Sequence, residues 1–180
     1  MSKSMIPVLL WGCLASGAAL AQAVDCTQQQ IAHNRRVVST VFEQVLSQGK
    51  VDENEHLYHA EFVAHGVTRD AGRAEDRAAS RGWRQAVPDL RMDVLRMVVE
   101  CDQVAVHWSG SGTNTGTGNG LPATGRHLEK LWGMTIFALR DGRIREEWTV
   151  FDQYRMLQQL GLLPDPAATE GNADTSTGAQ

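Results

Sequence analysis

The stretch Gly142-Arg-Ile-Arg-Glu-Glu-Trp-Thr-Val-Phe-Asp152, followed closely by Leu157-Gln-Gln-Leu-Gly161, predicts a turn, a strand and a closing helix. Side chains alternate between the two faces of a strand. We therefore expect every second residue to share one face, namely Ile144, Glu146, Trp148, Val150 and Asp152. Carboxylates among apolar residues suit the wall of a pocket that needs a tuned acid or base, because an unpaired carboxylate is costly to bury. The alternative is an edge strand whose charges lie near solvent.

The size and charge of the chain narrow the class of protein. It has 180 residues, enough for one domain with a real core, and a net charge of -4 without blocks of a single sign. Nothing in this charge pattern indicates a nucleic-acid partner. Cys-x-x-Cys and His-Glu-x-x-His patterns are missing from the sequence. The sequence therefore shows no metal-binding motif.

Residues 1–23 have the layout of a secretory signal peptide, with Lys3, an apolar run from Met5 to Leu20, and two small-residue cleavage options. The apolar run is too short and too interrupted for a stable membrane span. A lipoprotein signal with Cys13 as the acceptor is the alternative. The sequence predicts a periplasmic or secreted protein with no membrane attachment after cleavage.

Two cysteines, Cys26 and Cys101, remain after the predicted cleavage. Cys26 precedes the first predicted helix, and Cys101 falls in a predicted turn between strands. In an oxidising compartment they would be able to form a disulfide, which closes a long loop and stabilises the fold by a few kcal/mol in the chain-entropy model. Two separate free thiols are the alternative.

The predicted helices come first and the predicted strands follow. Helices are expected over Thr27–Ser47, Val51–His59 and Arg73–Ala86. The first begins with a capping box and carries an apolar stripe, and the third ends before Pro88. Segments rich in Val, Ile, Trp and Thr predict four strands. They span Leu90–Glu100, Gln103–Thr113, Arg126–Leu139 and Arg143–Asp152.

Helices followed by a meander of strands indicate an α+β fold. We expect a curved antiparallel sheet wrapped over three to four helices, forming a cone whose cavity suits a small apolar ligand. The domain is predicted to span residues 27–163. The glycine-rich segment 114–125 is expected to be a flexible loop at the rim, and the tail 164–180 to be disordered because it has no apolar anchor.

An ordered set of segments carries a family signature. It comprises Tyr58-His-Ala-Glu-Phe-Val-Ala-His65, Val87-Pro-Asp-Leu90, Asp102-Gln-Val-Ala-Val-His-Trp108, Gly112-Thr-x-Thr-Gly116, Leu121-Pro-Ala-Thr-Gly125, Ile136-Phe137, Asp141-Gly-Arg-Ile-Arg-Glu-Glu-Trp148, Asp152 and Leu157-Gln-Gln-Leu-Gly161. Together they resemble the SnoaL-like polyketide cyclase family, often called ester cyclases. The resemblance implies the α+β cone of nuclear-transport-factor-like proteins, a small apolar pocket and a homo-oligomer such as a dimer. It also implies an intramolecular aldol step that uses a carboxylic acid or base without metal or cofactor. By similarity, that group is Asp152.

Asp152 and His65 are the candidate catalytic residues. An apolar environment would raise the pKa of Asp152 toward the range of a useful general base. The alternative is a cap on the helix that begins near Gln153. His65 ends a predicted extended segment and would orient or protonate a carbonyl oxygen. The alternative is a buried histidine held by a backbone group.

Aromatic residues are the candidates for ligand binding. Trp108, Trp132 and Trp148 fall on three predicted strands and would form an aromatic wall, while Tyr58 adds a ring from a predicted helix. Core packing is the alternative for all four. If Trp108 lines the cavity, His107 faces the opposite side of the sheet.

These residues support two main functions. The first is an exported protein that binds a small apolar or ring-shaped carbonyl compound and catalyses cofactor-free cyclisation, isomerisation or dehydration. The alternative is a non-catalytic periplasmic binding module, whose cavity would hold no convergent polar pair. A third hypothesis, an assembly role through the outer face of the sheet, predicts a filled cone.

Overall fold

The computed structural model describes residues 26–164, so the predicted signal peptide and all but the first residue of the predicted tail lie outside it. The first helix, α1 (Gln28–Thr40), continues directly into a π-helical turn, η1 (Val41–Leu46). Together they occupy the helix predicted over Thr27–Ser47, although the π-helical turn was not predicted. The hydroxyl of Thr27 caps α1 by accepting a hydrogen bond from the backbone N–H of Gln30 at 3.1 Å. The apolar stripe of this helix is buried in the core.

The helix predicted over Val51–His59 is wrong. The structure has only a single 3-10 turn there, η2 (Glu55–Leu57), before the chain enters strand β1 (Tyr58–His65). Tyr58 and Phe62 are both buried and pack edge to face, with ring centroids 5.2 Å apart. A spacing of four residues places two side chains on one face of a helix and also on one face of a strand. The apolar pattern therefore could not separate the two structures.

The remaining elements lie close to their predicted positions. Helix α2 (Arg73–Ala86) follows a two-residue strand, β2 (Ala71–Gly72), and a closing helix, α3 (Gln153–Gln159), follows the last strand. The long strands are β3 (Arg91–Glu100), β4 (Gln103–Thr113), β5 (His127–Arg140) and β6 (Arg143–Phe151). These elements confirm the α+β class.

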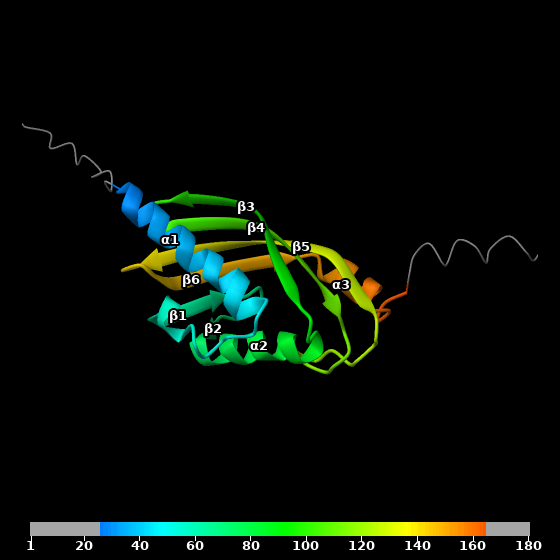
Figure 1. Ribbon diagram of the computed structural model, residues 1–180. Helices are drawn as coiled ribbons and strands as arrows, with labels where there is room; N and C mark the ends of the chain where they lie inside the picture. Colours follow the sequence, from blue (N-terminus) through cyan, green and yellow to red (C-terminus); the bar gives the residue numbers. More distant parts are fainter. Residues whose placement is uncertain (1–25, 165–180) are drawn as a thin grey trace, which may run out of the picture.

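The six strands form one sheet in the order β2-β1-β6-β5-β4-β3. Strand β1 pairs with β6 in parallel, so the sheet is mixed rather than antiparallel throughout as predicted. Figure 1 shows the long strands curving around α1 and α2, with α3 beside one end of β5. One apolar cluster joins α1 to the centre of the sheet, and a second joins the end of α2 to α3.

The loop between β4 and β5 is fixed to α2 rather than free at the rim. Asn114 is fully buried, and its amide donates hydrogen bonds to the carbonyl oxygens of Ala86 at 2.9 Å and Gly116 at 3.0 Å. Its side-chain oxygen accepts from both the backbone N–H and the hydroxyl of Thr124, at 2.9 and 2.8 Å. These four bonds order a segment whose glycines predicted flexibility.

Replacing Asn114 by Ala should lower the free energy of unfolding by about 2–4 kcal/mol, because it leaves several loop groups without partners. Urea denaturation followed by fluorescence measures this loss. The matched control is Thr115→Ala, an exposed neighbour whose loss should change stability by less than about 0.5 kcal/mol. Equal effects of the two changes would contradict the anchoring role of Asn114.

Candidate functional site

A β-bulge in β6 decides which of its side chains face the helices. The register of β6 against β5 shifts between Ile144 and Glu146. Ile144 is fully buried in the core, yet beyond the shift the cavity wall is formed by Glu147, Thr149 and Phe151. An extra residue in one strand reverses the alternation of faces that follows it.

The predicted inward face of β6 is therefore wrong beyond Ile144. Glu146, Trp148 and Val150 lie on the outer face of the sheet, where Trp148 is 41% and Val150 62% exposed. Strict alternation from Ile144 placed these three residues inside, because the sequence carries no visible mark of the bulge at Arg145.

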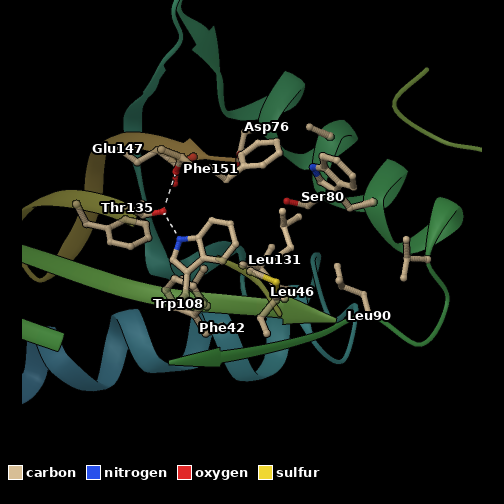
Figure 2. Close-up of a pocket in the computed structure, with 18 of the residues that line it drawn as sticks. Phe42, Leu46, Asp76, Ser80, Leu90, Trp108, Leu131, Thr135, Glu147 and Phe151 are labelled. Carbon is tan, nitrogen blue, oxygen red and sulfur yellow. Dashed lines mark hydrogen bonds between the residues drawn. The ribbon is translucent and has the colours of Figure 1, made fainter. Parts of the chain in front are cut away.

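The concave side of the sheet encloses a cavity of about 280 Å³. Its wall is mostly apolar and comes from η1, α2, the segment after α2 and strands β1 and β3 to β6. Large contributions come from Phe42, Leu46, Trp83, Leu90, Trp108, Leu131, Phe137 and Phe151. Figure 2 shows Glu147, Asp76 and Ser80 along one side of this cavity, across from Phe42, Leu46 and Leu90. The cavity therefore combines an apolar body with one polar side.

The indole of Trp108 is held in a fixed orientation within the cavity wall. Its ring N–H donates to the hydroxyl of Thr135 at 3.0 Å, and that hydroxyl bonds the hydroxyl of Thr149 at 2.9 Å (Figure 2). Gly133 makes room for the ring, since a Cβ at this position would lie 2.3 Å from the indole. Hydrogen bonding and close packing together keep Trp108 rigid.

Glu147 is an acid enclosed by protein. Burial raises the pKa of its carboxyl group to about 8, and the negative charge of Asp76 adds to this effect, while Arg73 opposes it. Among residues 26–164, no group forms a hydrogen bond or ion pair with the Glu147 carboxyl group. Glu147 is therefore mainly protonated at neutral pH and free to meet a ligand.

Asp76 differs from Glu147 because it has a cationic partner. The guanidinium of Arg73 forms an ion pair with the carboxylate of Asp76. A second ion pair joins one of its nitrogens to a carboxylate oxygen of Glu55 at 3.0 Å. Burial still raises the pKa of Asp76 above its ordinary value, against the effect of Arg73. The site thus holds one paired and one unpaired carboxyl group.

Tyr58 completes the polar side of the cavity. The Arg73 guanidinium lies over its ring, 3.4 Å from the centroid. Burial raises the pKa of the Tyr58 hydroxyl, and the charge of Asp76 raises it further. Tyr58 therefore remains a neutral phenol that can donate a hydrogen bond into the cavity.

The four predicted ligand-binding residues divide between the two faces of the sheet. Tyr58 and Trp108 line the cavity, although Tyr58 does so from strand β1 rather than from a helix. Trp132 and Trp148 lie on the outer face, and Trp132 is 48% exposed. His107 also faces outward and contacts Trp132 edge to face, with ring centroids 6.2 Å apart. The predicted wall of three tryptophans is absent from the cavity.

Asp152 is a helix cap in this structure. One carboxylate oxygen accepts a hydrogen bond from the backbone N–H of Arg155 at 2.9 Å, at the start of α3. Asp152 is not among the residues that line the cavity. The sequence left a catalytic base and a cap as alternatives, and the structure shows the cap. No general-base role is derived for Asp152.

His65 lies outside the cavity, at the edge of the outer face. Its Nε2 is 3.0 Å from a Glu146 oxygen and its Nδ1 is 3.2 Å from an Asp70 oxygen, while its ring stacks on Trp148 at 4.5 Å. The hydrogen bond to Glu146 raises the pKa of His65, and Asp70 adds to the shift. Two carboxylates, rather than a cavity ligand or a backbone group, hold this histidine.

Three polar residues of the site escaped the sequence prediction: Arg73, Asp76 and Glu147. The spacing of Arg73 and Asp76 on α2 is that of an ordinary ion pair between helix neighbours, so it does not mark a site. Glu147 stands next to Glu146, and adjacent strand residues must face opposite ways. One of the two glutamates therefore had to face inward, but only the position of the bulge decides which one.

Among residues 26–164, no group of three or more His, Cys, Asp or Glu side chains is placed to hold a metal ion. No helix there is long and apolar enough to cross a membrane.

Comparison with known proteins relates this geometry to a family. The model of the SnoaL-like polyketide cyclase family matches residues 36–160. A proposed SnoaL-like polyketide cyclase from a Jannaschia species has a similar structure, with a TM-score of 0.69 and 20% identity over 77% of this chain and 98% of its own. No curated protein sequence matches the chain significantly.

Two Streptomyces proteins share the same fold. TsrD from Streptomyces laurentii is 27% identical, with a TM-score of 0.66, and the match covers 73% of this chain and 97% of TsrD. IdmH from Streptomyces antibioticus, a proposed polyketide cyclase, is 25% identical, with a TM-score of 0.61 over 71% of this chain and 98% of IdmH. The chain belongs to the SnoaL-like polyketide cyclase family. The family and these neighbours together point to small-molecule binding or cyclisation.

The raised pKa of Glu147 has a consequence for stability. Between its ordinary pKa of 4.5 and the folded value of about 8, the folded state keeps a proton that the unfolded state releases. The free energy of unfolding should therefore fall with rising pH, by up to about 1.4 kcal/mol per pH unit in this window. Glu147→Gln removes this contribution.

Urea denaturation between pH 4.5 and 9 measures the free energy of unfolding of the wild type and of Glu147→Gln. The value for the wild type minus that for Glu147→Gln should fall steadily up to about pH 8 and become constant above it. Glu129→Gln, an exposed change on the same sheet, should follow the wild type throughout. A difference between the wild type and Glu147→Gln that does not vary with pH would show that Glu147 titrates as an ordinary glutamate.

Proposed function

We propose that this protein, exported as residues 1–23 predict, takes up a small apolar carbonyl compound and catalyses a cofactor-free proton transfer in it. Aldol-type cyclisation, isomerisation and dehydration all begin with such a transfer. The observation that carries the proposal is Glu147, an unpaired carboxylic acid in the wall of a mostly apolar cavity. Membership of the polyketide cyclase family supports the same class of chemistry.

Glu147 is the proposed general acid. A carboxyl group with a pKa near the working pH is suited to both giving and taking a proton. At neutral pH it would donate a hydrogen bond to the carbonyl oxygen of the ligand, and the Tyr58 hydroxyl would provide a second donor. An apolar site that keeps a carboxylic acid neutral can stabilise a developing oxyanion in this way.

Asp76 is the proposed base. Its ion pair with Arg73 fixes the position of the carboxylate, and burial makes it a stronger base than an exposed aspartate. Asp76 would take a proton from the carbon next to the carbonyl group while Glu147 protonates the oxygen, which gives an enol. The enol carbon then attacks a second carbonyl group within the molecule, while the enol O–H proton returns to Glu147 and Asp76 protonates the new oxyanion. In an isomerisation, the enol instead takes up the proton of Asp76 at another carbon as its O–H proton returns to Glu147.

The size of the cavity limits the ligand. At about 280 Å³, it is slightly smaller than most ligand pockets, which begin near 300 Å³. Phe42, Trp83 and Phe151 provide flat apolar surfaces in its wall. A compact compound of one or two rings fits these dimensions better than an extended chain.

A non-catalytic carrier is the alternative, and it predicts a cavity without convergent polar groups. Asp76, Glu147 and Tyr58 converge on one cavity, and one of the two acids has no partner. Leaving an acid unpaired in an apolar site costs stability, and binding an apolar compound does not require it. An acid that destabilises the fold without aiding the binding of an apolar compound favours a catalytic function over a carrier function. A purely structural protein was expected to have a cone filled by side chains, and the cavity of about 280 Å³ argues against that hypothesis.

Hydrogen–deuterium exchange next to a carbonyl group tests the proposed proton transfer without knowledge of the natural substrate. The probe is 2-tetralone, a two-ring ketone, in D₂O, followed by NMR. The wild type should accelerate the exchange, and Glu147→Gln should lower this acceleration by about 100-fold or more. Glu129→Gln serves as the control and should retain the wild-type rate.

Quenching of tryptophan fluorescence measures binding in the same samples, because Trp83 and Trp108 line the cavity. Binding of 2-tetralone without accelerated exchange would overturn the catalytic proposal and support the carrier. An equal acceleration by the wild type and Glu147→Gln would rule out Glu147 as the acid.

We also propose that the outer face of the sheet binds a second copy of this chain. Neighbouring strands place exposed apolar side chains side by side, with Ile136 beside Trp148 and Met134 beside Val150. Arg96 lies beside His107 on the edge strand β3, while Glu146 lies on β6, on the other side of these apolar side chains. A two-fold axis parallel to the strands would place β3 of one copy opposite β6 of the other.

Ile136→Lys should convert a dimer into a monomer, because it places a charge in the centre of this apolar face. Analytical ultracentrifugation measures the change. Val67→Lys is the matched control, since Val67 is fully exposed and lies in a loop. A monomeric wild type, or a dimer that survives Ile136→Lys, would exclude this face as the interface.

A further inference from the structure

The side chains in the cavity wall that can carry a charge at neutral pH, Asp76 and Glu147, are both acidic. Of the described residues that line the cavity, none is a lysine, an arginine or a histidine. Arg73 is not part of the lining, and its guanidinium is paired with Asp76 and Glu55. The cavity therefore offers a ligand no cation, and it presents one acid, Glu147, without a counter-ion.

Three aromatic rings form one surface within the same wall. Phe151 contacts Trp83 edge to face, with ring centroids 6.2 Å apart, and lies tilted against Trp108, with ring centroids 6.4 Å apart. All three residues line the cavity. Phe151 follows Glu147 on the same face of β6 by four residues, about 13 Å along an extended strand. The acid and the aromatic surface are thus separated by about the length of a compact ring compound.

We propose that the cavity binds a compact protonated amine, with its ammonium group against the Glu147 carboxylate and its apolar rings against the aromatic surface. The ammonium supplies the counter-ion that Glu147 lacks, and a hydrogen bond between two charged groups is stronger than one between neutral groups. Aromatic rings attract cations as well as apolar groups. This class of ligand goes beyond the carbonyl compound proposed above, and the inference depends on the cavity rather than on catalysis.

The same charges exclude anionic ligands. A carboxylate or phosphate in the cavity would add a negative charge to that of Asp76 and would find no basic side chain in the lining. Burying such an unpaired charge is costly. A cation meets the opposite situation, and Glu147 is its partner because Asp76 is already compensated by Arg73.

Binding of the amine would release one proton. At neutral pH Glu147 is mainly a neutral acid, because burial raises its pKa to about 8, with Asp76 adding to the shift and Arg73 opposing it. The pKa of the Tyr58 hydroxyl on β1 is raised as well, so this group stays neutral. The ammonium enters with its proton, and Glu147 loses its own proton to solvent. Affinity for the amine should therefore rise with pH, by up to about tenfold per unit below pH 8.

Three probes with one ring skeleton test the charge of the ligand. They are 2-aminotetralin as the cation, 2-tetralone as the neutral compound and tetralin-2-carboxylic acid as the anion. Isothermal titration calorimetry at pH 7 should show that the amine binds most tightly and that the anion does not bind. Titrations in two buffers of different ionisation enthalpy should show the release of about one proton for each amine bound.

Glu147→Gln keeps the shape of the acid and removes its charge. It should weaken binding of 2-aminotetralin by about 10- to 100-fold and abolish the release of the proton. Its affinity for 2-tetralone should stay within about threefold of the wild type, because an amide can still donate a hydrogen bond to a carbonyl oxygen. That second titration shows whether the cavity of the variant is intact. Glu129→Gln, the exposed matched control, should bind the amine as the wild type does.

Equal binding of the amine by the wild type and Glu147→Gln would overturn the inference, as would an anion bound as tightly as the amine. A loss of amine binding in Asp76→Asn but not in Glu147→Gln would also contradict it, because the ammonium would then lie at the other acid. Deuterium exchange in 2-tetralone without binding of the amine would refute this inference and leave the proposed catalysis standing. Binding of the amine without such exchange would support the inference and refute the catalysis.

Discussion

The change of register at Arg145 in β6 is the constraint on which the site depends. Before it, Ile144 belongs to the core beneath α1, and after it the odd-numbered residues face the cavity. Similar shifts interrupt β3 between Val94 and Arg96, and β4 between Gly110 and Gly112. Bulges bend strands and increase their twist. Three successive strand pairs, β3–β4, β4–β5 and β5–β6, therefore bend together, and the hollow that results is the cavity.

The protonation states of Asp76 and Glu147 depend on their burial in the cavity wall and on the guanidinium of Arg73 nearby. The positive charge of Arg73 compensates the negative charge of Asp76, with which it forms a direct ion pair. The same guanidinium also forms an ion pair with Glu55. An ionised Glu147 would be a second, uncompensated charge in an apolar wall. Burial is accordingly the main cause of its raised pKa. The raised pKa of Glu147 is thus consistent with the pairing of Arg73 with Asp76 and Glu55 rather than with Glu147.

Most of the fold could be predicted from the sequence, because caps, turns and apolar periodicity are local properties. The bounds of α2 and the four long strands followed from Pro88, Asp141-Gly142 and runs of β-branched residues. The strand at Tyr58 was missed because its apolar spacing also fits a helix. The site was missed for a different reason. Its location depends on a one-residue register shift and on α2 lying opposite β6, and neither is encoded locally.

Glu146 and Glu147 show how strongly this geometry determines chemistry. The two are neighbours in sequence, yet Glu146 lies outside between His65 and Arg145, while Glu147 lies inside without a partner. Moving the bulge by one residue would exchange their environments and leave the fold unchanged. The chemistry that a site can offer thus depends on the local register rather than on the fold. Similarity to the family placed the acid at Asp152, a helix cap, whereas the cavity itself presents Glu147.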